Sequence, residues 1–185
     1  MKIITIISTL LILGFSQLSA QVIYITDSSM VSFFSKAPVE DIEAFNTTSS
    51  SLLNVAKSEL VFRIPMTGFQ FEKPLMQEHF NENYMETEKY PHATFKGKFS
   101  DTLDLSKDTI YNLTVTGIMK MHGRDHAHSY NGTIESKSGV VTLKSEFKVH
   151  LVDHKIKIPK VVVANIAEVI DVKVFFQYKP YEKKK

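Results

Sequence analysis

The stretch from Val141 to Leu151 reads VTLKSEFKVHL, and it decides the fold class. Apolar or small side chains at the odd-numbered positions alternate with Thr, Lys, Glu, Lys and His at the even-numbered ones. Because successive side chains of a β-strand point to opposite faces, this period of two indicates a strand with one apolar and one polar face.

Four more stretches alternate in the same way, and each predicts a half-buried strand. Their inward positions are Leu60, Phe62, Ile64 and Met66; Ala93, Phe95, Gly97 and Phe99; Tyr111, Leu113, Val115 and Gly117; and Ile170, Val172, Val174, Phe176 and Tyr178. Shorter strands are expected at Met30–Ser35 and Ser51–Ala56. Asn131-Gly132 and Ser138-Gly139 predict hairpin turns, and residues 101–108 predict a polar loop.

Many strands with close connections favour antiparallel pairing, since parallel strands need long crossovers. About eight such strands either close into a barrel or stack as a sandwich, so the sequence predicts an all-β domain. Apolar residues at 75, 76, 80 and 84 have helical spacing, and Pro74 suits a first helical turn, so a helix across the barrel is expected over Lys73–Met85. A second short helix is expected over Pro38–Phe45, followed by a loop at Thr47–Ser51.

The first residues have the pattern of a secretory signal peptide. Lys2 precedes an apolar run from Ile3 to Leu13, well short of the roughly 20 residues that span a bilayer. Ser19 and Ala20 are small and fit a cleavage point. We therefore expect removal of residues 1–20, one mature domain over residues 21–185, export to the periplasm and no stable membrane anchor.

Composition excludes several classes of site. The chain contains no cysteine, so disulfides, thiol nucleophiles and thiolate metal sites are excluded. Its net charge is only +2, and the one basic run, residues 183–185, is expected to be a solvated tail, so nucleic acid is not an expected partner. No Gly-x-Ser-x-Gly elbow, phosphate loop or dinucleotide fingerprint is present. We expect no cofactor and no enzymatic activity.

Four blocks of this sequence resemble the YceI-like family. They are FRIPM at 62–66, LMQEHF at 75–80, YPHATF at 90–95 with Gly97, and a hydrophobic strand closing on His122-Gly123. Their order and spacing fit over about residues 22–178, and DIEA at 41–44 resembles a branch from Bacteroidetes-type bacteria. The resemblance implies a lipocalin-like antiparallel barrel in the periplasm whose interior holds a polyisoprenoid or similar amphiphile.

The inward faces supply the candidate ligand-binding residues. An eight-stranded barrel has an interior that side chains just fill or that holds one small ligand, and the sequence leaves both alternatives open. The predicted apolar lining consists of Phe33, Phe62, Ile64, Met66, Met76, Phe80, Phe95, Val115, Phe147, Val149 and Phe176, with Leu113 and Val174 beside them. The alternative to a carrier is a filled-barrel interaction or envelope-stress module. A homodimer is compatible with either.

Polar candidates are fewer. His122, Asp125, His126 and His128 contain donors that suit zinc, which would make a metal-dependent enzyme. Their position after a strand and before Asn131-Gly132 favours an exposed hairpin turn instead, so no metal is expected. His79 beside Glu78 is expected to be structural or to line the barrel mouth, because adjacent helical positions do not face each other. Arg63, Lys73 and Arg124 are candidates for an anionic head group.

Overall fold

A computed structural model describes residues 23–158 and 166–182. The predicted signal peptide and the terminal lysines lie outside the described residues. The strands are β1 (Ile23–Ser35), β2 (Ile42–Asn46), β3 (Ser50–Asn54), β4 (Glu59–Pro65), β5 (Gln70–Phe71), β6 (His92–Lys98), β7 (Thr109–Met121), β8 (Arg124–Lys137), β9 (Val140–His150) and β10 (Val169–Pro180). The helical segments are η1 (Met66–Gly68), α1 (Pro74–His79), η2 (Phe80–Tyr84) and η3 (Leu151–His154).

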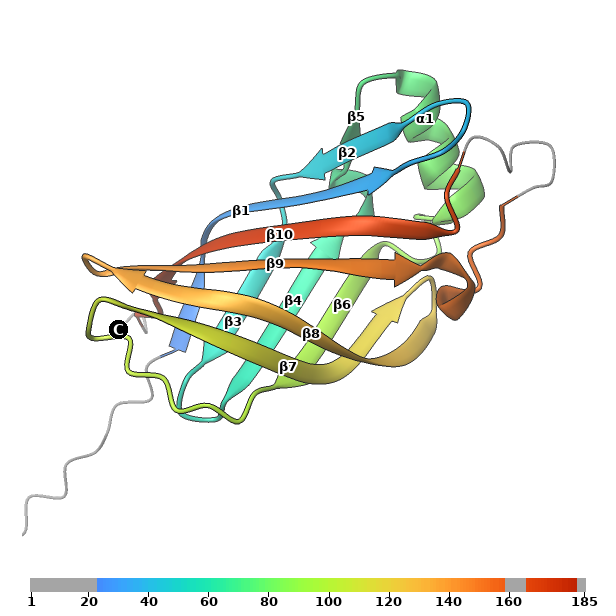
Figure 1. Ribbon diagram of the computed structural model, residues 1–185. Helices are drawn as coiled ribbons and strands as arrows, with labels where there is room; N and C mark the ends of the chain where they lie inside the picture. The colour runs from blue at the N-terminus through green and yellow to red at the C-terminus, as the bar shows by residue number, and fades with distance from the viewer. Residues whose placement is uncertain (1–22, 159–165, 183–185) are drawn as a thin grey trace, which may run out of the picture.

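Eight strands close into an antiparallel barrel, which confirms the predicted fold class (Figure 1). The order is β10-β9-β8-β7-β6-β4-β3-β1, and β1 pairs again with β10 along Tyr24–Phe34. This last ladder pairs the two end strands of the barrel with each other, so neither is left as an exposed edge there. The small strands β2 and β5 extend the sheet from the second half of β1.

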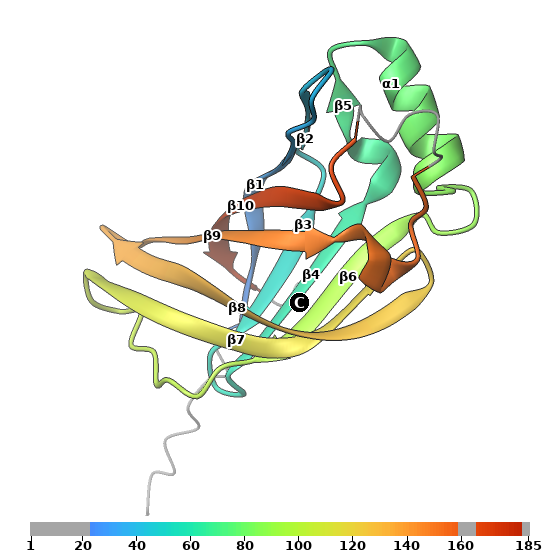
Figure 2. The same ribbon diagram turned by 45° about the vertical axis from the view of Figure 1, so that its right-hand side comes forward.

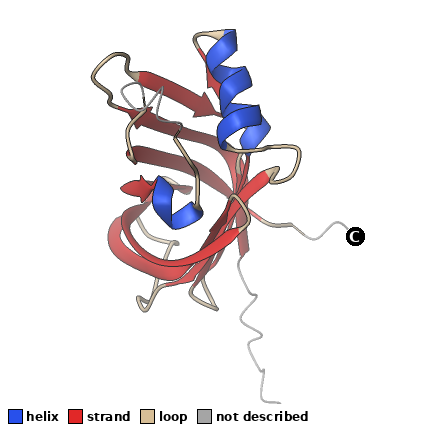
Figure 3. Cartoon of the chain, turned by 90° about the vertical axis from the view of Figure 1, so that its right-hand side faces the viewer, coloured by secondary structure: helices blue, strands red, loops and turns tan. Residues whose placement is uncertain are grey.

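The predicted helix over residues 73–85 is confirmed as α1, with Pro74 at its first position, followed by the π-helical turn η2. Together with β2 and β5, this helix stands over one end of the barrel (Figure 2). Figure 3 shows η3 as a separate turn at the side of the same opening. No helix in the described ranges is long and apolar enough to cross a bilayer.

The helix predicted over Pro38–Phe45 is wrong, because strand β2 occupies Ile42–Asn46. Ala44 and Asn46 point inward and are fully buried, whereas Glu43 and Phe45 are exposed, which is a period of two. The spacing of Val39, Ile42 and Phe45 resembles a helix only in isolation. Pairing with β1 and β5 decides the conformation of this segment. The predicted loop is confined to residues 47–49, since β3 begins at residue 50.

The turn predicted at Asn131-Gly132 is also wrong. Both residues lie inside β8, where Gly132 pairs with Leu113 on one side and Ser145 on the other. A Cβ atom on Gly132 would lie 2.8 Å from the carbonyl oxygen of Lys144, so the glycine allows a close approach of two strands. The turn that joins β7 to β8 is His122-Gly123, with φ of 49° and 70°. The second predicted turn, Ser138-Gly139, is confirmed and has φ of 50° and 80°.

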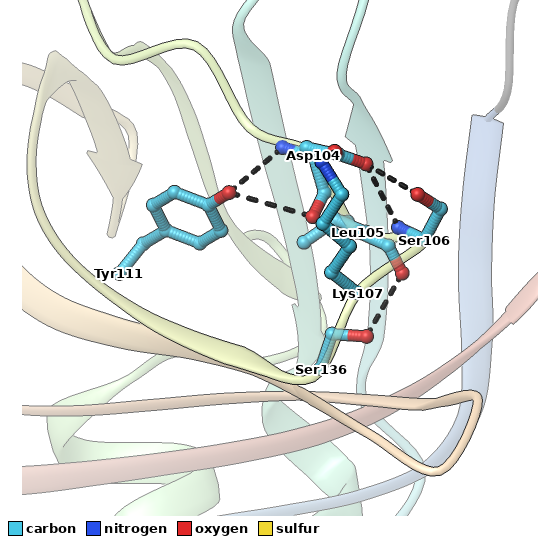
Figure 4. Close-up of polar contacts among 6 residues, drawn as sticks. All are labelled: Asp104, Leu105, Ser106, Lys107, Tyr111 and Ser136. Atoms are coloured by element: carbon cyan, nitrogen blue, oxygen red, sulfur yellow. Dashed lines mark hydrogen bonds and ion pairs between the residues drawn. The ribbon is translucent and has the colours of Figure 1, made fainter.

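The barrel end opposite the helix is closed by the loop between β6 and β7. Leu103 and Leu105 on this loop are buried, although the sequence predicts a polar loop. Ser136 Oγ donates to the carbonyl oxygen of Leu105 at 2.8 Å, and the Tyr111 hydroxyl accepts from the backbone N–H of Asp104 at 3.0 Å (Figure 4). These bonds hold the loop against β7 and β8, so the interior is covered at this end.

Candidate ligand-binding cavity

The barrel interior is hollow beneath α1. A cavity of about 250 Å³ is bounded by β1, β4, β6, β9 and β10 below and by α1 and η2 above. Its wall is almost entirely hydrocarbon; the residues with polar side chains that line it are Ser35, Glu40, His79 and Tyr84. The inward apolar residues therefore line a partly open apolar space at this end of the barrel, next to the packed core.

A cluster of four phenylalanines forms the part of the wall nearest the helix. Phe33 from β1 packs against Phe69, Phe71 and Phe80, with ring centroids 5.2, 5.8 and 5.6 Å away. Phe80 also contacts Phe71 at 5.1 Å and Phe69 at 5.6 Å. Aromatic pairs at these separations are favourable, so the rings fix the helix over the opening while presenting apolar faces to the cavity.

Methionines supply much of the remaining wall. Met66, Met76, Met85, Met119 and Met121 all line the cavity. An unbranched thioether side chain adapts to different apolar shapes at low cost, which makes such a wall adjustable. The space can therefore change its outline without a change in the backbone.

A second, smaller apolar space lies deeper in the barrel. It measures about 60 Å³ and is bounded by residues that include Phe62, Phe95, Val115 and Tyr130. Four side chains, those of Ile64, Ala93, Met119 and Phe147, line both spaces. The two spaces are therefore neighbours separated by a single layer of side chains.

Ten of the eleven residues predicted as lining do border one of these two spaces. Phe33, Ile64, Met66, Met76, Phe80, Phe147 and Val149 border the larger one, and Phe62, Phe95 and Val115 border the smaller one. Phe176 borders neither. It is fully buried, with its ring centroid 4.9 Å from that of Phe62, so it belongs to the packed core. Ligand binding by these residues stays a prediction.

Sequence reasoning missed part of the wall. Phe69 directly follows η1 and Phe71 lies in the two-residue strand β5, and Met119 and Met121 lie at the end of β7 beyond the stretch recognised as alternating. The odd-numbered alternation of β7 continues through both methionines, so a longer reading of that strand finds them. No pattern in the sequence identifies Phe69 and Phe71.

The predicted polar candidates lie outside the apolar space or at its rim. Lys73 forms an ion pair with Glu40, and this bond raises the pKa of Lys73. Arg63 points outward, with Nη2 2.9 Å from Nε2 of His92, and Arg124 is exposed at the start of β8. His79 is exposed and lines the larger space, which agrees with the expected place at the mouth.

The predicted histidine cluster is divided by the structure. His122 forms the β7–β8 turn, where Nδ1 donates to the carbonyl oxygen of His154 at 3.0 Å and Nε2 lies 2.7 Å from Glu86 Oε2. His126 and His128 are in strand β8, not in a turn, because the turn is confined to His122-Gly123 and β8 begins at Arg124. The residue that joins them is Asp153 of η3: one donor atom from each of the three lies within 4.8 Å of the others.

Burial changes the pKa values of two histidines in this region, His128 and His154. Burial lowers the pKa of His128, and the nearby His126 lowers it further. Burial also lowers the pKa of His154, and His128 acts in the same direction; Asp153 and the backbone of Arg124 oppose this shift. These imidazoles are therefore biased toward the neutral form, which is the form that ligates metals.

The fold and the cavity define the class of protein: a closed antiparallel barrel with an apolar internal space under a helical cover. The sequence matches the model of the YceI-like domain over residues 24–178, and the chain belongs to this family. Two of the family blocks meet in space, since the Tyr90 ring packs on Gly123 and lies 4.7 Å from the His122 ring.

Solved structures share the fold at low sequence identity. A polyisoprenoid binding domain from Saccharophagus degradans implicated in plant cell wall breakdown has a TM-score of 0.73 and 13% identity, covering 85% of this chain and 98% of that one. Burkholderia cenocepacia BcnA has a TM-score of 0.66 and 15% identity, covering 82% and 96%. The Campylobacter jejuni YceI protein has a TM-score of 0.59 and 14% identity, covering 78% and 88%. No curated protein has a matching sequence.

Proposed function

We propose that this protein is an exported carrier that holds an isoprenoid or another long-chain amphiphile in its barrel. The observation that carries the proposal is the 250 Å³ apolar cavity beneath α1. An apolar cavity of about 150 Å³ is enough for benzene, so this one accommodates a longer hydrocarbon segment. The structural neighbour from Saccharophagus degradans is described as a polyisoprenoid binding domain, which supports the same ligand class.

Hydrophobic burial supplies the affinity in this proposal. Each 100 Å² of apolar ligand surface removed from water contributes about 2.5 kcal/mol. A hydrocarbon tail has no groups that need polar partners, so a wall of phenylalanine, methionine and aliphatic side chains suits it. The polar rim at Glu40, Lys73 and His79 lies where a head group of the amphiphile would remain in contact with water. The proposal assigns binding rather than catalysis to this site.

A longer tail needs both apolar spaces. Ile64, Ala93, Met119 and Phe147 form the layer between them, and Met119 is the most adaptable member. Movement of this side chain joins the space of about 60 Å³ to the larger one. In this proposal, the tail enters under α1 and its end lies between Phe62 and Tyr130.

Lipid analysis of the purified protein tests the proposal directly. Protein isolated from a lipid-containing host is expected to carry about one amphiphile per chain by native mass spectrometry, and isoprenoid alcohols of increasing length are expected to displace a fluorescent fatty probe. Protein that carries no amphiphile and does not bind the alcohols would contradict the carrier function and favour the interaction module.

A filling variant tests the location. Ala93 is buried and borders both spaces, so Ala93→Phe places a ring at their junction. We expect the affinity for the alcohols to fall at least about tenfold, which is a loss of about 1.4 kcal/mol. Ile118→Phe, on the exposed face of β7, is the matched control. If Ala93→Phe does not fold, Val172→Phe places a ring in the larger space from the opposite wall, where Val172 is half-buried. Its affinity for the alcohols is then compared with that of Ile118→Phe.

We also propose that the protein is periplasmic, on the basis of the signal-peptide pattern in residues 1–20. Fractionation of the native host with N-terminal sequencing tests this. Mature protein in the periplasmic fraction beginning near Gln21 is the expected result, and an intact N-terminus in the cytoplasm contradicts it.

A further inference from the structure

Strand β8 and helix η3 bring a second group of functional side chains together, outside the apolar cavity. His126 and His128 are two residues apart on β8, so both side chains leave the same face of the strand. The β8–β9 ladder begins at Gly132 and Ser145, so it does not include the first residues of β8. Helix η3 packs against this part of β8 and contributes Asp153.

The geometry of the three side chains fits a metal ion. The ring centroids of His126 and His128 are 4.7 Å apart, and one donor atom each from these two residues and Asp153 lie within 4.8 Å of one another. Donor atoms in a tetrahedral zinc site are about 3.4 Å apart, given bonds of about 2.1 Å. Small side-chain rotations close that difference, and His126 is exposed and free to make them.

An unpartnered nitrogen atom is the second, independent observation. His128 Nε2 is buried and has no hydrogen-bond partner among the residues that the structure describes. The completely buried His154 lies beside it, with its ring centroid 5.9 Å from that of His128. Buried polar atoms normally have a partner, so a donor atom left open at the edge of a His-His-Asp group points to a ligand.

We propose that His126, His128 and Asp153 form a binding site for a divalent transition-metal ion such as zinc. Two imidazoles and a carboxylate are a donor set that such ions accept, with a further position left open to solvent beside the exposed His126. His154 packs behind the site and is not assigned as a ligand. This proposal departs from the sequence-based expectation of no metal, because Asp153 is far from the histidines in the sequence.

The metal would act as a clamp on the barrel wall. Tyr130 separates the site from the cavity, since its ring stacks on His128 at 5.2 Å and packs on Phe147 at 4.1 Å. Leu151, at the start of η3, lines the cavity. A bond from the ion to Asp153 would therefore hold η3 against β8 and fix one wall of the proposed ligand space without entering it.

Zinc titration of the full mature chain, prepared without a histidine tag and dialysed against a chelator, tests the site. We expect one Zn²⁺ per chain by calorimetry, an upward shift of the thermal unfolding midpoint on binding, and no binding of Mg²⁺, which prefers an all-oxygen shell. Co²⁺ in place of Zn²⁺ is expected to give a visible absorption band typical of low coordination number.

Two matched pairs of variants separate this site from adventitious surface binding. Asp153→Asn and His126→Ala are expected to weaken zinc binding by more than about a hundredfold, since even changes to groups behind metal ligands weaken binding 10- to 100-fold. Asp125→Asn, on the opposite face of β8, and His92→Ala, beside Arg63, are expected to bind as the wild type does. The proposal is overturned if Asp153→Asn binds zinc as tightly as Asp125→Asn, or if His126→Ala binds it as tightly as His92→Ala. It is also overturned if the wild type does not bind one equivalent of zinc. Zinc binding that leaves the hydrogen exchange of the η3 backbone amides unchanged would overturn the clamp.

Discussion

Removing one buried hydroxyl, that of Tyr178, should change both the stability of the barrel and its response to alkali. Tyr178 in β10 is 4% exposed, and its hydroxyl forms a hydrogen bond of 2.7 Å with Ser51 Oγ in β3, which is 6% exposed. Tyr178→Phe removes the bond and leaves the Ser51 hydroxyl buried without it. We expect a loss of about 1–3 kcal/mol in the free energy of unfolding at pH 7.

The pH dependence follows from the same burial. Burial raises the pKa of the Tyr178 hydroxyl, and the bond with Ser51 only partly opposes the shift. A raised pKa in the folded state means that the stabilisation is complete below the unfolded value of about 10 and is lost as pH rises above it. The wild type therefore loses about 1.4 kcal/mol per pH unit above pH 10 through this group, and Tyr178→Phe does not. At pH 7 the wild type has the larger free energy of unfolding. Its advantage over Tyr178→Phe should shrink above pH 10 and reverse by about pH 11 to 12.

Urea unfolding of both proteins between pH 7 and pH 11 measures the effect. The other tyrosines and the lysines titrate equally in both, so the difference isolates Tyr178. Ser51→Ala and the double variant complete a cycle whose coupling free energy should be about 1 kcal/mol. A difference that stays constant from pH 7 to pH 11 would show that Tyr178 ionises equally in the folded and unfolded chain, and would refute the reasoning.

Two further predictions concern the turn glycine Gly123 and the aspartate of the loop that covers the closed barrel end. Gly123→Ala should reduce the free energy of unfolding by more than about 2 kcal/mol, because a left-handed φ costs about 1–2 kcal/mol and the new Cβ would lie 2.5 Å from the Tyr90 ring. Gly139 has a similar φ, but a Cβ atom added there would meet no atom within 4 Å. Gly139→Ala should therefore lose only the free energy due to the left-handed backbone, and equal losses in the two variants would contradict the role of Tyr90. The bonds of Asp104 to Lys107 and Ser106 lower its pKa to about 2, so its stabilisation is present above about pH 4 and is lost as pH falls toward 2. Asp104→Asn should flatten the acid unfolding curve over that range, and an unchanged curve would show that the loop carboxylate does not contribute.

The interior faces of the strands could be predicted from the sequence because a half-buried strand must alternate. Val141, Leu143 and Val149 are all buried as the period of two requires, and Lys144 and Lys148 are exposed. Patterns of neighbouring residues predicted the wrong conformation where pairing with other strands decided it instead. Asn131-Gly132 is a strong turn pattern, yet both residues extend a long hairpin, because the left-handed conformations occur at His122 and Gly123 instead.

Sequence alone therefore determined the alternating strands with their apolar faces, the helix at Pro74 and membership of the YceI-like family, but it did not find strands β2 and β8. Only the tertiary structure decided that these faces leave a partly open space of about 250 Å³ instead of filling it, since that depends on how far the helix and the strands stand apart. It also brought Asp153 to His126 and His128. The contact of residues so far apart depends on the register of β8 and β9 and on where their ladder begins, which no local pattern of side chains specifies.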